Sequence, residues 1–158
     1  MTLKMTNAHS SALRINLQLW IPNENIYVKM ASIFDTGASK TIIDTELAEL
    51  LCIEKSNTVA KTITATGLIS LPTGKLQKIK IGTQEIHNVP ISITKLPMEL
   101  EVRCVLGMNV LREFLITVDS LNRVITLEKQ PLPIKYQKDR YSISLLSDDE
   151  KKEGNTDV

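Results

Sequence analysis

The sequence predicts a mostly β, single-domain fold. Apolar and polar residues alternate with a period of two in several short segments, the pattern of strands with one buried face. Turn-forming residues separate these segments, and only two stretches read as short helices. The 158 residues are enough for one domain with a substantial core. Together these observations indicate a β domain built from hairpins.

The first predicted element is a hairpin over residues 13–34. Its first strand alternates apolar with polar residues, the apolar ones being Leu13, Ile15, Leu17 and Leu19. Residues 22–25 form a turn, and residues 26–34 form the second strand. This hairpin delivers Asp35 to its far end.

A short helix follows, with Asp44 as its expected N-cap. Three leucines are expected on one face of this helix: Leu47, Leu50 and Leu51. A second hairpin is predicted from strands over 59–66 and 75–81, with a turn over 71–74 between them. Residues 86–94 add another strand with alternating apolar positions.

The last part of the core begins with an apolar strand that ends at Gly107. A short helix is expected over 109–114, and a third hairpin over 116–127 closes the core. We therefore divide the chain into an N-terminal arm (1–12), a core domain (13–129) and a C-terminal tail (130–158). The tail has two prolines near its start, Pro131 and Pro133, and is acidic from residue 147, so we expect it to be flexible from there on.

Composition argues against several functional classes. The formal net charge is +1 and no basic run is visible, so neither nucleic acid nor an anionic membrane is an expected partner. No segment has the length of a membrane span or a signal-peptide core, and the cytoplasm is the expected location. Cys52 and Cys104 form no CxxC pair, which argues against zinc. Two buried thiols are favoured over a disulfide.

The residues most indicative of chemistry are Ile33-Phe34-Asp35-Thr36-Gly37-Ala38-Ser39. Apolar flanks partly desolvate Asp35, and an ionised carboxylate then needs hydrogen-bond partners. Thr36 supplies a hydroxyl, and Gly37 allows the sharp turn that presents backbone N–H groups. A lone Asp-Thr-Gly is most often a capped turn, so the motif gains weight only from its surroundings.

Three segments together resemble the retropepsin-like aspartic peptidases. The first is the Asp35 motif with Thr41-Ile42-Ile43 after it, and the second is the central hairpin, in the place of the family's flap. The third is the segment 105–111, which resembles the family's apolar-Gly segment leading into a short helix. The likeness covers about residues 13–128, although Ser32 and the apolar, proline-containing flap tip expected at 68–73 depart from the pattern.

The resemblance implies an aspartic endopeptidase that needs no metal or organic cofactor. Carboxylate-catalysed peptide hydrolysis uses one general base and one general acid. Because this chain has one motif, the simplest completion is a C2 homodimer in which Asp35 of each subunit contributes to a dyad that activates water. Two close carboxyls share a proton, which predicts an acid-shifted optimum, whereas Ala38 resembles the retroviral form that works nearer neutrality.

The resemblance also assigns roles to individual residues. Asp35, Thr36 and Gly37 form the catalytic loop, with Thr36 linking the two loops across the dimer. The expected contacts to an extended peptide substrate are Ala38, Thr66, Gly67, Leu68 and Ile69. The expected supporting residues are Ser39, Leu106, Gly107 and Asn109.

Other interpretations remain open or are disfavoured. The same fold can serve as an inactive peptide-binding or dimerisation module, and this is the main alternative. A phosphate-binding loop at Gly67 and Gly74-Lys75 is disfavoured, because the spacing is wrong and Leu76 stands where a hydroxyl is needed. Met98 and Met108 are expected to fill gaps in the core.

Overall fold

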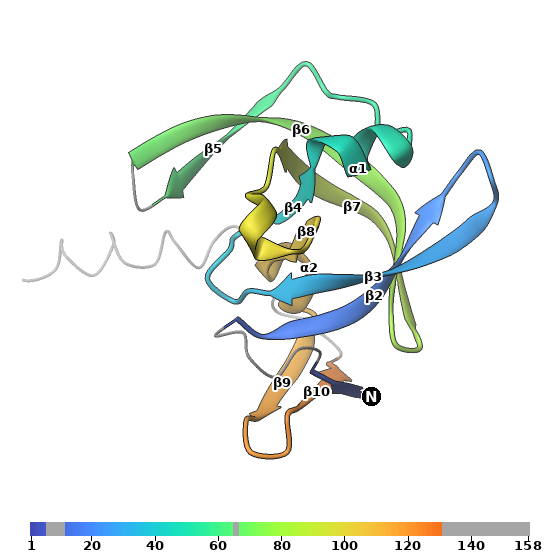
Figure 1. Ribbon diagram of the computed structural model, residues 1–158, viewed down its shortest axis with the longest axis vertical. Helices are drawn as coiled ribbons and strands as arrows, with labels where there is room; N and C mark the ends of the chain where they lie inside the picture. Colours follow the sequence, from blue (N-terminus) through green and yellow to red (C-terminus); the bar gives the residue numbers. More distant parts are fainter. Residues whose placement is uncertain (6–11, 65–66, 131–158) are drawn as a thin grey trace, which may run out of the picture.

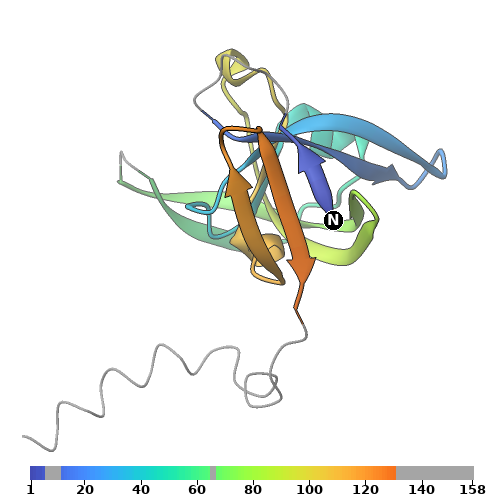
Figure 2. The same ribbon diagram turned by 90° about the horizontal axis from the view of Figure 1, so that it is seen from below.

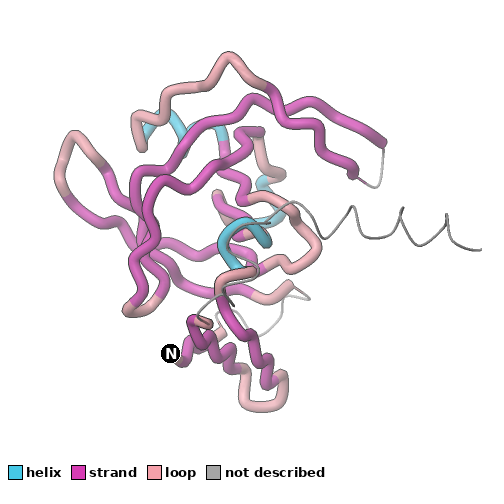
Figure 3. Tube along the Cα trace, turned by 180° about the vertical axis from the view of Figure 1, so that it is seen from behind, coloured by secondary structure: helices cyan, strands magenta, loops and turns pink. Residues whose placement is uncertain are grey.

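The computed structural model describes residues 1–5, 12–64 and 67–130, and its elements are predominantly strands (Figures 1 and 3). In chain order they are β1 (Thr2–Lys4), β2 (Arg14–Ile21), β3 (Ile26–Phe34), β4 (Thr41–Asp44), α1 (Thr45–Leu50), β5 (Val59–Thr64), β6 (Gly67–Ile81), β7 (Gln84–Thr94), the 3₁₀ helix η1 (Met98–Leu100), β8 (Cys104–Leu106), α2 (Met108–Leu111), β9 (Phe114–Asp119) and β10 (Val124–Lys129). The predicted mostly β architecture with two short α-helices is confirmed.

The strands form two sheets. The larger has the order β2-β3-β8-β4-β7-β6-β5, and β2 also pairs with β6, so this sheet closes on itself. The smaller sheet has the order β1-β10-β9 and lies at the lower side of the molecule in Figure 1, where Figure 2 shows it from below. One hydrophobic cluster draws on both sheets, with Ile15 and Ile125 fully buried in it. No helix in the described ranges is long and apolar enough to cross a membrane.

The first predicted hairpin is confirmed. β2 and β3 pair antiparallel from Arg14↔Ile33 to Ile21↔Ile26. The alternating apolar residues of β2 face the core, and Ile15, Leu17 and Leu19 are at most 1% exposed. β3 ends at Phe34, so Asp35 does stand at the far end of this hairpin.

The predicted second hairpin is wrong in its register. β6 is one continuous strand that pairs with β5 over Gly67–Pro72 and with β7 over Thr73–Ile81, so no turn occurs at 71–74. The predicted flap tip, residues 68–73, lies within this strand. Thr64 pairs with Gly67, which places the connection at residues 65–66, outside the described residues.

The turn-like composition around Gly74 has a different physical cause. At this glycine β6 passes close to the segment after α1, and a Cβ would lie 2.6 Å from Ile53 Cγ2. Pro72 is the last residue of β6 that pairs with β5, where the strand changes partners. Glycine and proline therefore accommodate a crossing of segments here, and the chain stays extended.

Two strands, β1 and β4, were not predicted from the sequence. β1 lies in the segment predicted as an arm and pairs with β10, and three residues are too few to show an alternation. β4 follows the Asp35 motif and lies between β7 and β8, parallel to the first and antiparallel to the second. Its short apolar run gives no period, but its pairing brings the end of the motif into the centre of the large sheet.

Several side chains lie differently from the prediction. Leu47 and Leu51 of the α1 region are buried, whereas Leu50 is 55% exposed because it points away from the sheet. Met98 is 87% exposed in η1 and fills no core gap. Cys104 is a buried free thiol as expected, but Cys52 is an exposed one. The second helix also starts and ends earlier, over Met108–Leu111, and Phe114 begins β9.

A surface cluster anchors the far end of β6 to the first hairpin. Lys78 Nζ lies 4.4 Å from the centroid of the Trp20 ring, and Trp20 packs edge-on against Tyr27. Tyr27 donates a hydrogen bond to Glu85 of β7. Desolvation and this hydrogen bond raise the pKa of Tyr27 to about 12. We define the flap hairpin as β5 with Gly67–Pro72. β6 thus connects this hairpin to the part of the large sheet where the surface cluster holds β2, β3, β6 and β7 together.

Candidate active site

Asp35 lies directly after β3, where two neighbouring segments hold its backbone. Its N–H donates to the carbonyl of Leu106 at 3.0 Å, and the preceding N–H of Phe34 donates to Leu13 at 2.7 Å. Its carboxylate Oδ1 accepts from the N–H of Gly37 at 2.8 Å. The side chain is half-buried, while Thr36 and Gly37 are exposed. The carboxylate is therefore oriented by its own loop and still reachable from solvent.

The loop after Asp35 is attached to the start of α2. The N–H of Met108 donates to the carbonyl of Ala38 at 2.7 Å, and that of Asn109 donates to Ser39 at 3.2 Å. The N–H of Ala38 in turn donates to the carbonyl of Asp35 at 3.3 Å. These hydrogen bonds supply acceptors for N–H groups at the start of the helix. The same bonds fix the path of the loop.

Asn109 joins three segments through its side chain. Its Oδ1 accepts from the N–H of Thr41 at 2.8 Å and from the Thr41 hydroxyl at 2.9 Å. Its Nδ2 donates to the carbonyl of Pro90 at 2.7 Å. Thr41 Oγ1 also accepts from the N–H of Gly107 at 3.2 Å. Asn109 and the fully buried Thr41 therefore connect the end of the Asp35 loop to β7 and to the Gly107 segment.

Gly107 is required by close approach. A Cβ at this position would lie 2.5 Å from both the carbonyl carbon and the oxygen of Lys40, and 2.9 Å from the oxygen of Ala38. Backbone atoms cannot give way as a flexible side chain can. Any side chain here would push the Asp35 loop away from the strand that supports it.

An apolar row continues from Asp35 along the same face of the sheet. Val105 is in register with Ile33 on one side and with Ile42 on the other. The alternate residues of these strands, such as Phe34 and Leu106, face the core. Side chains alternate between faces, so Ile33, Val105 and Ile42 share the face on which Asp35 continues. Ile33 and Ile42 are partly exposed there.

The flap hairpin lies on the same side of the molecule as the Asp35 loop, as Figures 1 and 2 both show. Leu68 is 63% exposed and Ile69 is 39% exposed, so their side chains are available for contacts. Gly67 has a φ of +125°, a backbone conformation that favours glycine. The predicted contact Thr66 lies outside the described residues.

The structure thus brings the four predicted supporting residues together around Asp35: Ser39, Leu106, Gly107 and Asn109. Ala38, predicted as a substrate contact, lies in the same loop. Sequence reasoning missed Thr41 and the apolar row. The signal for the row was present in the apolar pairs Ile42-Ile43 and Val105-Leu106, but only strand register tells which member of each pair faces outward.

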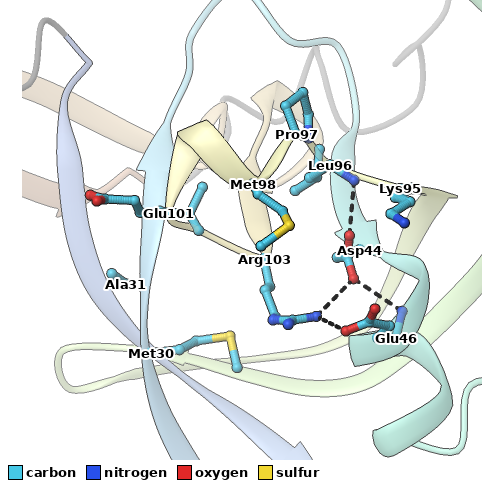
Figure 4. A pocket seen from close by; sticks show the side chains of 11 residues that line it. Met30, Ala31, Asp44, Glu46, Lys95, Leu96, Pro97, Met98, Glu101 and Arg103 are labelled. Atoms are coloured by element: carbon cyan, nitrogen blue, oxygen red, sulfur yellow. Dashed lines mark hydrogen bonds and ion pairs between the residues drawn. The ribbon is translucent and has the colours of Figure 1, made fainter.

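Asp44 belongs to a separate pocket of about 440 Å³, which Asp35 does not line (Figure 4). The predicted helix cap is confirmed, since Asp44 Oδ1 accepts from the N–H of Glu46 at 3.0 Å. Its other oxygen accepts from Leu96 at 2.9 Å, and Arg103 lies 3.2 Å from Oδ1. Burial acts to raise the pKa of Asp44, but these hydrogen bonds and the Arg103 charge outweigh it and lower the pKa.

The arrangement around Asp35 suits proton transfer to and from water. A carboxylate can accept a proton from a water molecule, but a complete hydrolysis also needs an acid. No second carboxylate hydrogen-bonds to Asp35 within the described part of the chain. No three His, Cys, Asp or Glu side chains in the same ranges lie close enough together to hold a metal ion.

Comparisons with known proteins identify the family and the fold. Residues 25–113 match the family described as "gag-polyprotein putative aspartyl protease". A retropepsin-like aspartic protease from Rickettsia conorii has a similar fold, with a TM-score of 0.55 and 22% identity over 80% of this chain and 88% of that one. No curated protein matches the sequence significantly. The family resemblance seen in the sequence and the fold predicted from it are both confirmed.

Proposed function

The chain belongs to the gag-polyprotein aspartyl protease family, and from this premise we propose that it is a homodimeric aspartic endopeptidase in which Asp35 of each subunit contributes to the dyad. The observation that carries the proposal is the half-buried Asp35 carboxylate, held by its own loop yet open to solvent. Its immediate surroundings supply backbone donors and apolar side chains, and the missing partner is a second carboxyl group.

A second copy completes the chemistry. Two carboxyl groups held close together share one proton, because both cannot ionise at that distance. The ionised carboxylate takes a proton from water as the water attacks the peptide carbonyl carbon, and the protonated one donates to the carbonyl oxygen. The pair titrates as a unit, so the pH dependence of the activity reports apparent pKa values of the pair and not of either carboxyl group alone.

The free edge of the small sheet is the surface where we expect the second copy to bind. β9 is the end strand of the order β1-β10-β9 within the described residues, and its backbone groups on that edge are available for pairing. Figure 1 shows β9 at the lower side of the molecule, below the end of β3. Leu115 is 52% exposed and Leu121 is 90% exposed on this hairpin. The proposed dimer uses this edge and joins the Asp35 loops of its two copies.

A peptide substrate would lie extended between the flap hairpin and the apolar row. Main-chain hydrogen bonds to strand edges give such binding its affinity, and pockets for alternate side chains give its selectivity. Ile33, Val105 and Ile42 form the floor beside Asp35, while Leu68 and Ile69 contribute from above. We therefore expect apolar side chains next to the scissile bond.

The test compares wild type with Asp35→Asn on a diverse peptide library, with products identified by mass spectrometry. The incubations span about pH 3.5 to about pH 7.5, the range over which carboxyl pairs change protonation. We expect cleavage by wild type and a loss of about 10³-fold or more in the variant. Sedimentation at the same protein concentrations measures the dimer.

Either of two results would overturn the proposal. One is cleavage that is unchanged in Asp35→Asn, which would assign the activity to another site. The other is the absence of cleavage at every pH by a protein shown to be a folded dimer. Peptide binding without turnover would then favour an inactive peptide-binding module on the same fold.

A further inference from the structure

A pocket of about 470 Å³ lies between the flap base and the end of the Asp35 loop. Three lysines from separate parts of the chain line it: Lys40 after the motif, Lys55 after α1 and Lys75 on β6. All three are exposed, and one carboxylate, that of Glu54, also lines the pocket. No basic run marks this place in the sequence, because the lysines meet only when the chain folds.

The hydroxyl groups that line the pocket already form hydrogen bonds with one another and with the backbone. The Thr73 hydroxyl donates to the carbonyl of Thr58 at 2.9 Å, and the two threonine hydroxyls lie 2.9 Å apart. Ser56 Oγ lies 2.9 Å from Thr58 Oγ1. The backbone N–H of Ser56 donates to the carbonyl of Thr73 at 2.8 Å. This network attaches the Lys55 segment to β6. The lysine ammonium groups remain as the donors for an occupant.

None of the three lysines has a carboxylate within ion-pair distance among the described residues, where the ion pairs involve Arg14, His87 and Arg103 instead. A wall with three cations and one anion attracts a negatively charged group. The pocket is also open to solvent, so the attraction is screened and moderate.

The strand spacing gives the approximate distance between Asp35 and the pocket. The backbones of Asp35 and Lys40 flank the Leu106–Gly107 segment, since Asp35 donates to Leu106 and Lys40 touches Gly107. Two strand spacings separate them, about 10 Å, and an extended peptide advances about 3.3 Å per residue. A substrate side chain that reaches Lys40 therefore belongs to a residue about three positions from the scissile bond.

We propose that this pocket binds an acidic side chain, Asp or Glu, of the peptide substrate about three residues from the scissile bond. The inference rests on the proposed peptidase function and specifies its substrate class. The C2 dimer would contain two such pockets, one at each end of the cleft. The selectivity is then for acidic residues on both sides of an apolar scissile pair.

The experiment uses one peptide with an apolar central pair and Gln, Glu or Lys at the third position on either side. It is run at about pH 6, where Glu is ionised. For wild type we expect Glu to raise kcat/KM about two- to fivefold over Gln, the size of an exposed ion pair, and Lys to lower it. Raising NaCl from about 0.05 M to about 0.5 M should bring the Glu/Gln ratio toward one.

Charge-reversal variants locate the effect. Lys40→Glu and, from a different segment, Lys55→Glu should each abolish or invert the Glu/Gln ratio. Lys29→Glu is the matched control, since Lys29 is an exposed lysine of β3 that does not line the pocket. Circular dichroism checks that each variant is folded. An unchanged ratio in both folded pocket variants overturns the inference.

Binding separates this inference from the proposed function. The Asp35→Asn protein is titrated with the same labelled peptides, and the Kd ratio between Gln and Glu should match the kcat/KM ratio of wild type. If wild type cleaves the Gln peptide through Asp35 but shows no preference for Glu, the inference is wrong and the peptidase stands. If nothing is cleaved but Glu still tightens binding, the pocket stands and the peptidase proposal is wrong.

Discussion

Asp35 directly follows β3 and Asp44 is the last residue of β4, two strands of the same sheet, but the fold surrounds them differently. Asp44 is 5% exposed, and its two oxygens accept from two backbone N–H groups and from Arg103. Asp35 is half-buried, and within the described residues its carboxylate accepts one hydrogen bond, from Gly37. Two similar sequence contexts thus produce one closed carboxylate and one open carboxylate.

The difference shows what a fold requires of each role. An ionised carboxylate has about four lone-pair sites, and Asp44 uses most of its sites inside the chain. Such a group is held in place and adds to stability. Asp35 has its orientation set by one bond and keeps capacity for water or a second carboxyl group. The comparison predicts that stability depends on Asp44 and activity on Asp35.

The largest expected effect on stability comes from Asp44→Ala. It removes a helix cap and leaves the partly buried N–H of Leu96 without its acceptor, which together lower the free energy of unfolding by about 3 kcal/mol. Asp35→Ala should change it by about 0.5 kcal/mol or less, as for other open sites. Urea unfolding at one fixed protein concentration measures both, since dimerisation makes stability depend on concentration.

The conservative variant sharpens this comparison. Asp44→Asn keeps an oxygen that can cap the helix, so it should be less destabilising than Asp44→Ala. Equal losses of stability in Asp35→Ala and Asp44→Ala would contradict the division of roles.

A smaller effect is expected from Asn109→Ala, which links the two properties. It leaves the N–H of the buried Thr41 without an acceptor and should cost about 2 kcal/mol of stability. The Asp35 loop also loses a support, so kcat should fall about tenfold. Asn122→Ala, in an exposed turn where Asn122 bonds to Asp119, is the matched control and should change neither. A loss of stability with unchanged kcat would show that Asn109 does not position the loop.

The smallest effect is a pH dependence. Burial acts to raise the pKa of Asp44, but its hydrogen bonds and the Arg103 charge outweigh burial, so this pKa lies below the usual value of an aspartate. Its contribution to stability is therefore full above the unfolded-state pKa and is lost as the pH falls through the folded-state pKa. The stability difference between wild type and Asp44→Asn should shrink as the pH is lowered from about 5 to about 3. A difference that grows toward acid would contradict the lowered pKa.

The amino-acid sequence alone was enough to predict the fold class, the first and third hairpins, the position of Asp35 and the helix cap at Asp44. These depend on local signals: alternation along a strand, a capping residue before a helix, and a motif whose loop is held by its own atoms. The family likeness added the four supporting residues around Asp35, and the structure places them at that loop.

Contacts between distant segments set the register of β6, the strands β1 and β4, the exposure of Leu50 and Met98, and the apolar row at Val105. The same holds for the pocket where Lys40, Lys55 and Lys75 meet. Each of these depends on which segments pair or pack together across long sequence separations. A local pattern shows that a residue is apolar or charged, but the neighbouring strand determines which face it occupies and which side chains surround it.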